Sequence, residues 1–261
     1  MNAIWDYYNS YDEESRLEKD NYHKTEFVTT IRLLEPYLTG TKTILEVGAG
    51  TGRYSCWLAE QGHRVTAVDF TPKHVEIMRR KIAEKQLSNM RAELGDARDL
   101  SAYAAGSFDL VLCLGPLYHI QDEGGRRACL DECLRVLKPG GTVAAGYINR
   151  AGVYLNQLMR RPEVLLQHPP LVFFDADQPG SFPDGCFVHS SPAEMLHFMS
   201  PYDLLDVKHA AVDGLAPLIW DCVNQMDAEQ FAGWVDYQYA VSCDPYQLGS
   251  SVHNLYIGTK H

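Results

Sequence analysis

The sequence predicts an α/β protein with a doubly wound, mostly parallel sheet of seven strands, helices on both faces and a cap insertion after the fifth strand. Three observations support this prediction. Short apolar runs alternate with amphipathic segments between residues 43 and 148, an order typical of parallel strands joined by crossover helices. A glycine-rich turn follows the first run, and the alternation ends after residue 149.

The central part of the chain is expected to contain five strands and three helices. The strands are expected over residues 43–47, 64–69, 91–94, 108–114 and 142–148. The helices are expected over residues 53–61, 72–86 and 125–137. The sequence Lys-Pro-Gly-Gly at residues 138–141 predicts a helix breaker followed by a turn. Because crossovers between parallel strands are right-handed, the helices should cover both faces of the sheet.

The two ends of the chain complete the predicted organisation. Residues 1–39 are expected to form an arm rich in Tyr, Asp and Glu followed by a helix, and residues 40–149 a ligand-binding core. Residues 150–261 are expected to finish the sheet and to carry insertions that cap a substrate. This last part is interpreted as an irregular stretch over residues 161–192, strands over 202–212 and 251–259, and a helical insertion over 217–240.

Composition and charge narrow the classes of partner. A chain of 261 residues that is 46% hydrophobic can bury one large core. Its 34 acidic residues outnumber 23 basic ones, and the net charge of −11 disfavours nucleic acid and anionic membranes. We expect a cytoplasmic protein, because the start lacks a basic segment followed by an apolar one and no apolar run approaches the roughly 18 residues of a membrane helix.

Cysteine usage also favours a reducing compartment. The seven cysteines are odd in number and lack a Cys-x-x-Cys pair, which argues against a disulfide framework. Cys129 and Cys133 share one face of a predicted helix. Core packing is the expected role of this pair, and no metal is expected.

The most informative motif is an apolar strand, a glycine-rich turn and a helix start over residues 44–54, Ile-Leu-Glu-Val-Gly-Ala-Gly-Thr-Gly-Arg-Tyr. Glycines permit a tight turn and the close approach of a ligand, and a helix N-terminus offers amide groups. A nicotinamide-dependent Rossmann enzyme would have its third glycine where Arg53 stands. The spacing E-x-G-x-G-x-G that begins at Glu46 instead resembles the first motif of the Rossmann-like class I S-adenosylmethionine-dependent methyltransferases. The resemblance covers about residues 40–150.

The resemblance implies S-adenosylmethionine as cofactor, S-adenosylhomocysteine as product, and the role of a cofactor-binding core for residues 40–149, over which the arm would close. In the family an acid after the second strand holds the ribose hydroxyls, here Asp69, and an acid after the third contacts the adenine amino group, here Asp96. A capping role for Asp69 before Thr71 and a surface-loop role for Asp96 stay open. The expected cofactor-binding residues are Glu46, Gly48, Ala49, Gly50, Asp69, Phe70, Asp96, Ala97 and Leu114.

His74 departs from the family pattern, because many relatives have Met at this position, over the adenine. Its ring could stack on the base, or it could be a surface residue of the helix.

His119 and Tyr11 are the candidate catalytic residues. His119 follows the fourth strand, where the ligands of open α/β sheets bind, and its ordinary pKa suits a general base. It could instead cap the next helix or fix the loop. Tyr11, with Tyr7 and Tyr8, could close over the positively charged sulfonium, or the arm could simply pack on the sheet.

The preferred function is methyl transfer to a small-molecule acceptor, because the acidic chain and its insertions suggest an enclosed pocket. Orientation of the reactants and exclusion of water can supply most of the catalysis. The Asn/Asp-Pro-Pro-Tyr tetrapeptide of some amino methyltransferases is absent. Residues 147–152 weakly resemble tRNA-wobble-modifying methyltransferases, so RNA modification is one alternative and a non-catalytic S-adenosylmethionine-binding protein is another. The methylated atom and the oligomeric state stay open.

Overall fold

One mixed sheet of eight strands organises the computed structural model, which describes residues 7, 11–175 and 186–261. The strands are β1 Thr43–Val47, β2 Arg64–Asp69, β3 Met90–Leu94, β4 Phe108–Cys113, β5 Leu137–Asn149, β6 His189–Ser190, β7 Leu205–Ala211 and β8 His253–Thr259. Their order is β3-β2-β1-β4-β5-β8-β7, with β6 paired to β5. Strands β1 to β5 are parallel, whereas β8 runs antiparallel to both β5 and β7.

The predicted fold class is confirmed. All seven expected strands form, and the sequence missed only β6, whose two residues are too few to show a period. The expected turn at residues 138–141 is wrong, because these residues belong to the start of β5. The irregular pairing of β4 with β5 between Phe108 and Leu110 accommodates them.

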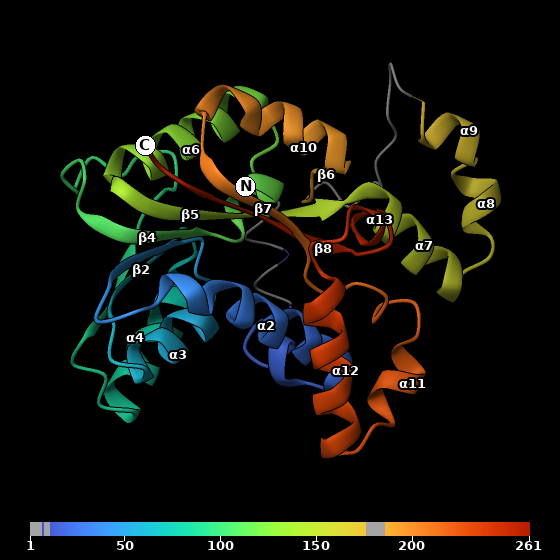
Figure 1. Cartoon of the computed structure of the whole chain (residues 1–261), viewed down its shortest axis with the longest axis horizontal. Coiled ribbons are helices and arrows are strands. Elements are labelled where there is room, and N and C mark those ends of the chain that lie inside the picture. The colour runs from blue at the N-terminus through green and yellow to red at the C-terminus, as the bar shows by residue number, and fades with distance from the viewer. Residues whose placement is uncertain (1–6, 8–10, 176–185) are drawn as a thin grey trace.

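Helices cover both faces of the sheet (Figure 1). One face carries α2 Asn21–Leu34, α3 Arg53–Glu60 and α4 Pro72–Glu84, and the other carries α6 Glu123–Val136 and α10 Pro192–Met199. Successive strand residues point to opposite faces, so Ile44 packs with the first group and Leu45 with the second. In the described part of the chain, no helix is both long enough and apolar enough to cross a membrane.

The remaining helices are short or lie at the ends of the sheet. They are η1 Arg16–Glu18, η2 Glu35–Tyr37, α5 Pro116–His119, α7 Arg150–Arg160, α8 Val164–Gln167, α9 Pro170–Phe173, η3 Ser200–Tyr202, α11 Trp220–Asn224, α12 Ala228–Val241 and α13 Pro245–Leu248. Helices α7, α8 and α9 follow β5 and project from one end of the sheet (Figure 1). The expected insertion after the fifth strand is therefore present, with a small core of its own formed by Tyr154, Val164 and Phe173.

Candidate functional site

A cavity of about 250 Å³ lies against the segments that follow β1, β2, β3 and β4. Strands β1 and β4 are neighbours, but the chain leaves β1 toward β2 and leaves β4 toward β5. Such a switch in strand order opens a crevice at the carboxyl ends of the strands, where open α/β sheets bind ligands. The nine residues expected to bind the cofactor all line this cavity: Glu46, Gly48, Ala49, Gly50, Asp69, Phe70, Asp96, Ala97 and Leu114.

The loops after β1 and β4 touch each other at the floor of the cavity. Gly48 has a φ of +67°, and a Cβ at this position would lie 2.6 Å from Cδ of Pro116. Only glycine combines this left-handed backbone with so close a neighbour. The glycine motif therefore allows the two loops to pack together at the cavity.

Asp69 holds the glycine loop and the start of α4 together. Its Oδ2 accepts a hydrogen bond from the backbone N–H of Gly50 at 2.7 Å, and its Oδ1 accepts one from the N–H of Thr71 at 2.8 Å. Nδ1 of His74 lies 3.2 Å from the same Oδ1. The backbone amide of Gly50, one of the expected cofactor-binding residues, thus donates to Asp69. The carboxylate has both a structural contact and a face on the cavity.

Burial raises the pKa of Glu46 at the end of β1 to about 7, although a hydrogen bond from the Ser55 hydroxyl lowers it. The side chain is 2% exposed and faces the cavity. A carboxyl group with such a pKa releases its proton when a cation arrives beside it.

Asp96 and His74 complete the cavity wall. Asp96 pairs with Arg98 at 2.6 Å, and hydrogen bonds from Arg98 lower the pKa of this carboxyl group. His74 is 3% exposed, so its interpretation as a surface residue is wrong. It lines the cavity from the first turn of α4.

Residues 44–141 match the model of a family described as a methyltransferase domain. The chain carries a class I S-adenosylmethionine-dependent methyltransferase domain. It is similar to a ubiquinone biosynthesis O-methyltransferase of Xanthomonas campestris pv. campestris, with 36% identity over 107 residues. The similarity covers 41% of this chain and 43% of that protein, so the chain spans less than half the length of this relative.

Solved structures share the fold over nearly the whole chain. A possible histamine N-methyltransferase from Thermotoga maritima aligns with a TM-score of 0.62 and 18% identity, covering 99% of both chains. The [4+2]-cyclase SpnF aligns with a TM-score of 0.58 and 19% identity, covering 90% of this chain and 81% of its own. At these identities the likeness concerns the fold of the methyltransferase domain alone.

The two residues expected to be catalytic occupy different places. His119, at the end of α5, lines the cavity described above, which we call the cofactor cavity after the residues expected to bind the cofactor. Nδ1 of His119 lies 3.0 Å from the carbonyl oxygen of Cys186. This contact ties α5 to the segment before β6, as the loop-fixing interpretation expects, and leaves a base role untested. Tyr11 does not line the cofactor cavity. Its ring stacks on the ring of Tyr7, with the two ring centroids 5.3 Å apart. Tyr8 lies outside the described residues.

Residues of the N-terminal arm that the sequence analysis did not single out line the cofactor cavity. Glu13, Glu14, Arg16 and Leu17 line it. Arg16 donates two hydrogen bonds to Glu26 on α2, at 2.7 and 3.3 Å, and one to Glu13 at 3.1 Å. Nothing local in the sequence indicates this pairing, because Arg16 and Glu26 are ten positions apart in an acidic stretch.

A second cavity of about 210 Å³ adjoins the first, and we call it the aromatic cavity. The two share Glu13, Arg16, Glu26 and Tyr118 as wall residues. The other residues that line the aromatic cavity are Tyr7, Tyr11, Tyr22, His23, Ile148, Phe187, Asp213 and His253. It therefore lies beside the ends of β5 and β8, separated from the cofactor cavity by the Arg16–Glu26 pair.

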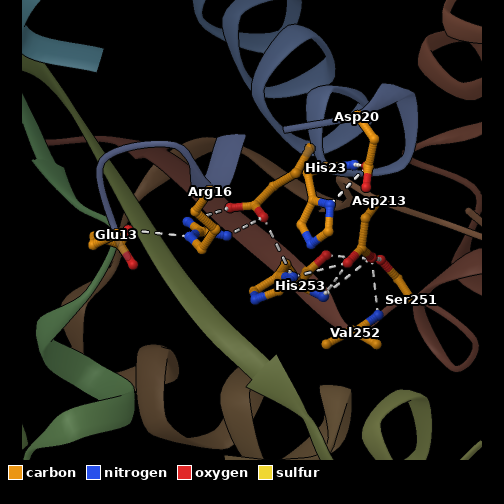
Figure 2. A network of polar contacts seen from close by, with 9 residues as sticks. Glu13, Arg16, Asp20, His23, Asp213, Ser251, Val252 and His253 are labelled. Carbon is orange, nitrogen blue, oxygen red and sulfur yellow. Dashed lines mark hydrogen bonds and ion pairs between the residues drawn. The ribbon is translucent and has the colours of Figure 1, made fainter. Parts of the chain in front are cut away.

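Polar groups on one side of the aromatic cavity form a connected network (Figure 2). Nδ1 of His253 lies 2.8 Å from Oδ2 of Asp213 and 3.5 Å from Oε2 of Glu26. Burial alone would raise the pKa of Glu26, but Arg16 and His253 lower it to about 2. Glu26 is therefore a carboxylate at every physiological pH.

Three buried cysteines lie away from both cavities, between β4 and α6. Cys113 joins Cys129 and Cys133, and their sulfur atoms lie within 4.8 Å of one another. They pack among Leu130, Val143 and other core residues with no exposed surface. The contribution of Cys113 from a different element could not be read from helical spacing.

The contact between the two loops predicts unequal effects of two glycine substitutions. Gly40 has a φ of +71°, close to that of Gly48, but a Cβ there meets nothing within 4 Å. Gly40→Ala should cost about 1 kcal/mol for the left-handed backbone. Gly48→Ala should cost an additional 1–3 kcal/mol, roughly, for overlap with Pro116. Thermal unfolding of both variants measures the difference, and equal losses would show that the loops do not depend on this contact.

Proposed function

We propose that the protein transfers the methyl group of S-adenosylmethionine to a small-molecule acceptor. The observation that carries this proposal is the pairing of two cavities at the carboxyl ends of the parallel strands. One gathers the glycine loop with the acids at or just after the carboxyl ends of β1, β2 and β3, and the other combines five Tyr and Phe rings with charged side chains.

The residues of the first cavity match the parts of S-adenosylmethionine. The glycine loop admits the ligand close to the backbone. Asp69 is assigned to the ribose hydroxyls and Asp96 to the adenine amino group, and His74 lies where it can border the base. Glu46 is assigned to the positively charged end of the cofactor, because a buried carboxyl group without a cation is held partly protonated.

Methyl transfer from S-adenosylmethionine requires no covalent bond between the protein and the methyl group. The sulfonium already activates the methyl group, so the chain must hold donor and acceptor in line and exclude water. Arg16, Glu26 and Tyr118 form a common wall of the two cavities and are placed to fix the relative position of the two ligands.

A small molecule fits the acceptor side better than RNA. The aromatic cavity is small, and the net charge of −11 repels a phosphate backbone. The curated relatives are named as ubiquinone biosynthesis O-methyltransferases, which supports a small acceptor that carries a hydroxyl group. One protein of the same fold is named a cyclase, so a fold does not by itself decide the reaction. Formation of S-adenosylhomocysteine with a panel of phenols separates an enzyme from a non-catalytic binding protein.

The ribose assignment predicts that Asp69→Asn weakens binding of S-adenosylhomocysteine by about 1.5–3 kcal/mol, since a charged acceptor is lost. Isothermal titration calorimetry measures this change. Asp109→Asn is the matched control, because Asp109 also accepts a backbone N–H, from Thr43 at 2.8 Å, but does not line the cavity. An unchanged dissociation constant in folded Asp69→Asn would remove Asp69 from the ribose site.

The raised pKa of Glu46 predicts proton release when the cofactor binds near pH 7. The cation of the ligand favours the carboxylate, so affinity should be greatest above pH 7 and fall as the pH drops below it. Calorimetry in buffers of different ionisation enthalpy measures the protons released. Glu46→Gln should abolish the release, and a release that persists in this variant would assign the proton to another group.

The charge of the chain predicts weak binding of transfer RNA at physiological salt, because the long-range electrostatic term is unfavourable. A filter-binding titration at several salt concentrations checks this expectation. Tight binding that weakens steeply as salt is added would instead favour RNA modification.

A further inference from the structure

His253 stands at the first position of β8, beside the end of β5, and lines the aromatic cavity. We propose that His253, oriented by Asp213, is the general base that takes the proton from a hydroxyl acceptor bound in the aromatic cavity. This inference rests on the proposed methyltransferase function. The acceptor would carry a hydroxyl group, and His253 is a second candidate base in addition to His119.

Asp213 is held rigidly and in turn holds the imidazole. The carboxylate is 1% exposed and accepts hydrogen bonds from the Ser251 hydroxyl and from the backbone N–H groups of Val252, at 2.9 Å, and His253, at 3.1 Å. Its other oxygen lies 2.8 Å from Nδ1 of His253 (Figure 2). A carboxylate in this position keeps the proton of a neutral imidazole on Nδ1, which leaves the lone pair on Nε2.

Nε2 is the nitrogen available to a ligand. It has no hydrogen bond to any residue in the described ranges, and the side chain is 25% exposed. Since Nδ1 faces Asp213 and Glu26, Nε2 lies on the opposite side of the ring. The imidazole therefore presents its basic nitrogen away from the carboxylates that orient it.

The charged groups around His253 strengthen it as a base. Burial alone would lower its pKa, but Glu26 on α2 and Asp213 raise it above the ordinary value, while Arg16 on η1 opposes them. His23, also on α2, is the other titratable histidine of the same cavity. The two carboxylates stabilise the imidazolium that forms when the proton is taken.

His23 is a weaker candidate although it also contacts a carboxylate. Its partner Asp20 is the N-cap of α2, three positions away, and is 27% exposed. Asp20 accepts a hydrogen bond from the backbone N–H of His23, so the contact is explained by capping. Asp213 has no such local role, because its partners lie about 40 residues away in the sequence.

The walls of the aromatic cavity select a planar acceptor. Rings of Tyr7, Tyr11, Tyr22, Tyr118 and Phe187 contribute to it from four separate segments. Aromatic rings of a ligand stack or pack edge-on against such side chains. Together with a base and nearby carboxylates, this lining fits a phenol better than a carboxylic acid, which Glu13, Glu26 and Asp213 would repel.

Nε2 of His253 accepts the proton of the acceptor hydroxyl while the oxygen lone pair forms a bond to the methyl carbon. The carbon–sulfur bond breaks, and its electron pair returns to sulfur as a neutral thioether. The products are a methyl ether, S-adenosylhomocysteine and an imidazolium, which releases its proton to solvent.

The first test uses 4-nitrophenol, whose phenol and phenolate absorb at different wavelengths, bound to the full chain with S-adenosylhomocysteine. In the wild type the base should shift the bound probe toward phenolate at a pH below the probe's own pKa. His253→Gln should lose this shift, and His23→Gln, the matched control from the same cavity, should keep it. Failure of the wild type to bind the probe would contradict the aromatic cavity as a phenol site.

Turnover with the best phenol of the panel provides the second test. His253→Gln should lower kcat by about 10²- to 10⁴-fold with little change in KM for S-adenosylmethionine, and should lose the acid limb of the pH profile. Asp213 is a positioning residue, so Asp213→Asn should also lose that limb, because an amide beside Nδ1 favours the wrong tautomer.

A measurement on the wild type covers the case in which these variants do not fold. The ¹⁵N chemical shifts of labelled histidine should show His253 with its proton on Nδ1 above its pKa. A proton on Nε2 would overturn the proposal.

The phenolate shift also distinguishes His253 from His119. Loss of the shift in His119→Gln together with its retention in His253→Gln would overturn the proposal and make His119 the base. If S-adenosylhomocysteine itself does not bind, the methyltransferase function fails first, and calorimetry on the same samples distinguishes that result.

Discussion

The placement of β1 beside β4 is the constraint on which the cofactor cavity depends. The loops after these strands leave in opposite directions, and Gly48 packs closely against Pro116 where they meet. A larger residue at position 48 would force the loops apart. This contact fixes the floor of the cofactor cavity, and Asp69 fixes its side by holding Gly50. The acids of the site therefore derive their positions from backbone geometry.

The Arg16–Glu26 pair governs the boundary between the two cavities. It joins the segment at η1 to α2 and contributes a wall to each cavity. Because Arg16 keeps Glu26 ionised, a fixed negative charge lies between the proposed cofactor and acceptor sites. A positively charged methyl donor on one side and a developing imidazolium on the other are both stabilised by that charge.

The sequence predicted the fold, and the expected cofactor-binding residues line one cavity, for the same physical reason. Short apolar runs bounded by turn residues predicted β1 to β5, and Glu46, Asp69 and Asp96 lie at or just after the carboxyl ends of β1, β2 and β3. Parallel strands bring their carboxyl ends to one edge, so the order of motifs in the sequence was enough to place these residues together.

The aromatic cavity could not be predicted in the same way. His253 begins β8 and Asp213 follows β7, and the contact of His253 with Glu26 joins them to α2. None of these residues has a characteristic spacing. Tyr11 was expected to close over the cofactor but lines the aromatic cavity, because the contacts of the arm with the cofactor cavity come from residues 13–17.

The buried polar network is better explained by chemistry than by stability. Burying charges costs several kcal/mol each by desolvation, roughly, and well-packed apolar residues often stabilise a fold as much as a buried ion pair does. Glu26 and Asp213 nevertheless lie together with Arg16 and His253 at the wall of a cavity, each with defined partners. Among the described residues, these partners contact Nδ1 of His253 and leave its Nε2 without a hydrogen bond. A base held in this way at the wall of a cavity is what proton transfer from a bound acceptor requires.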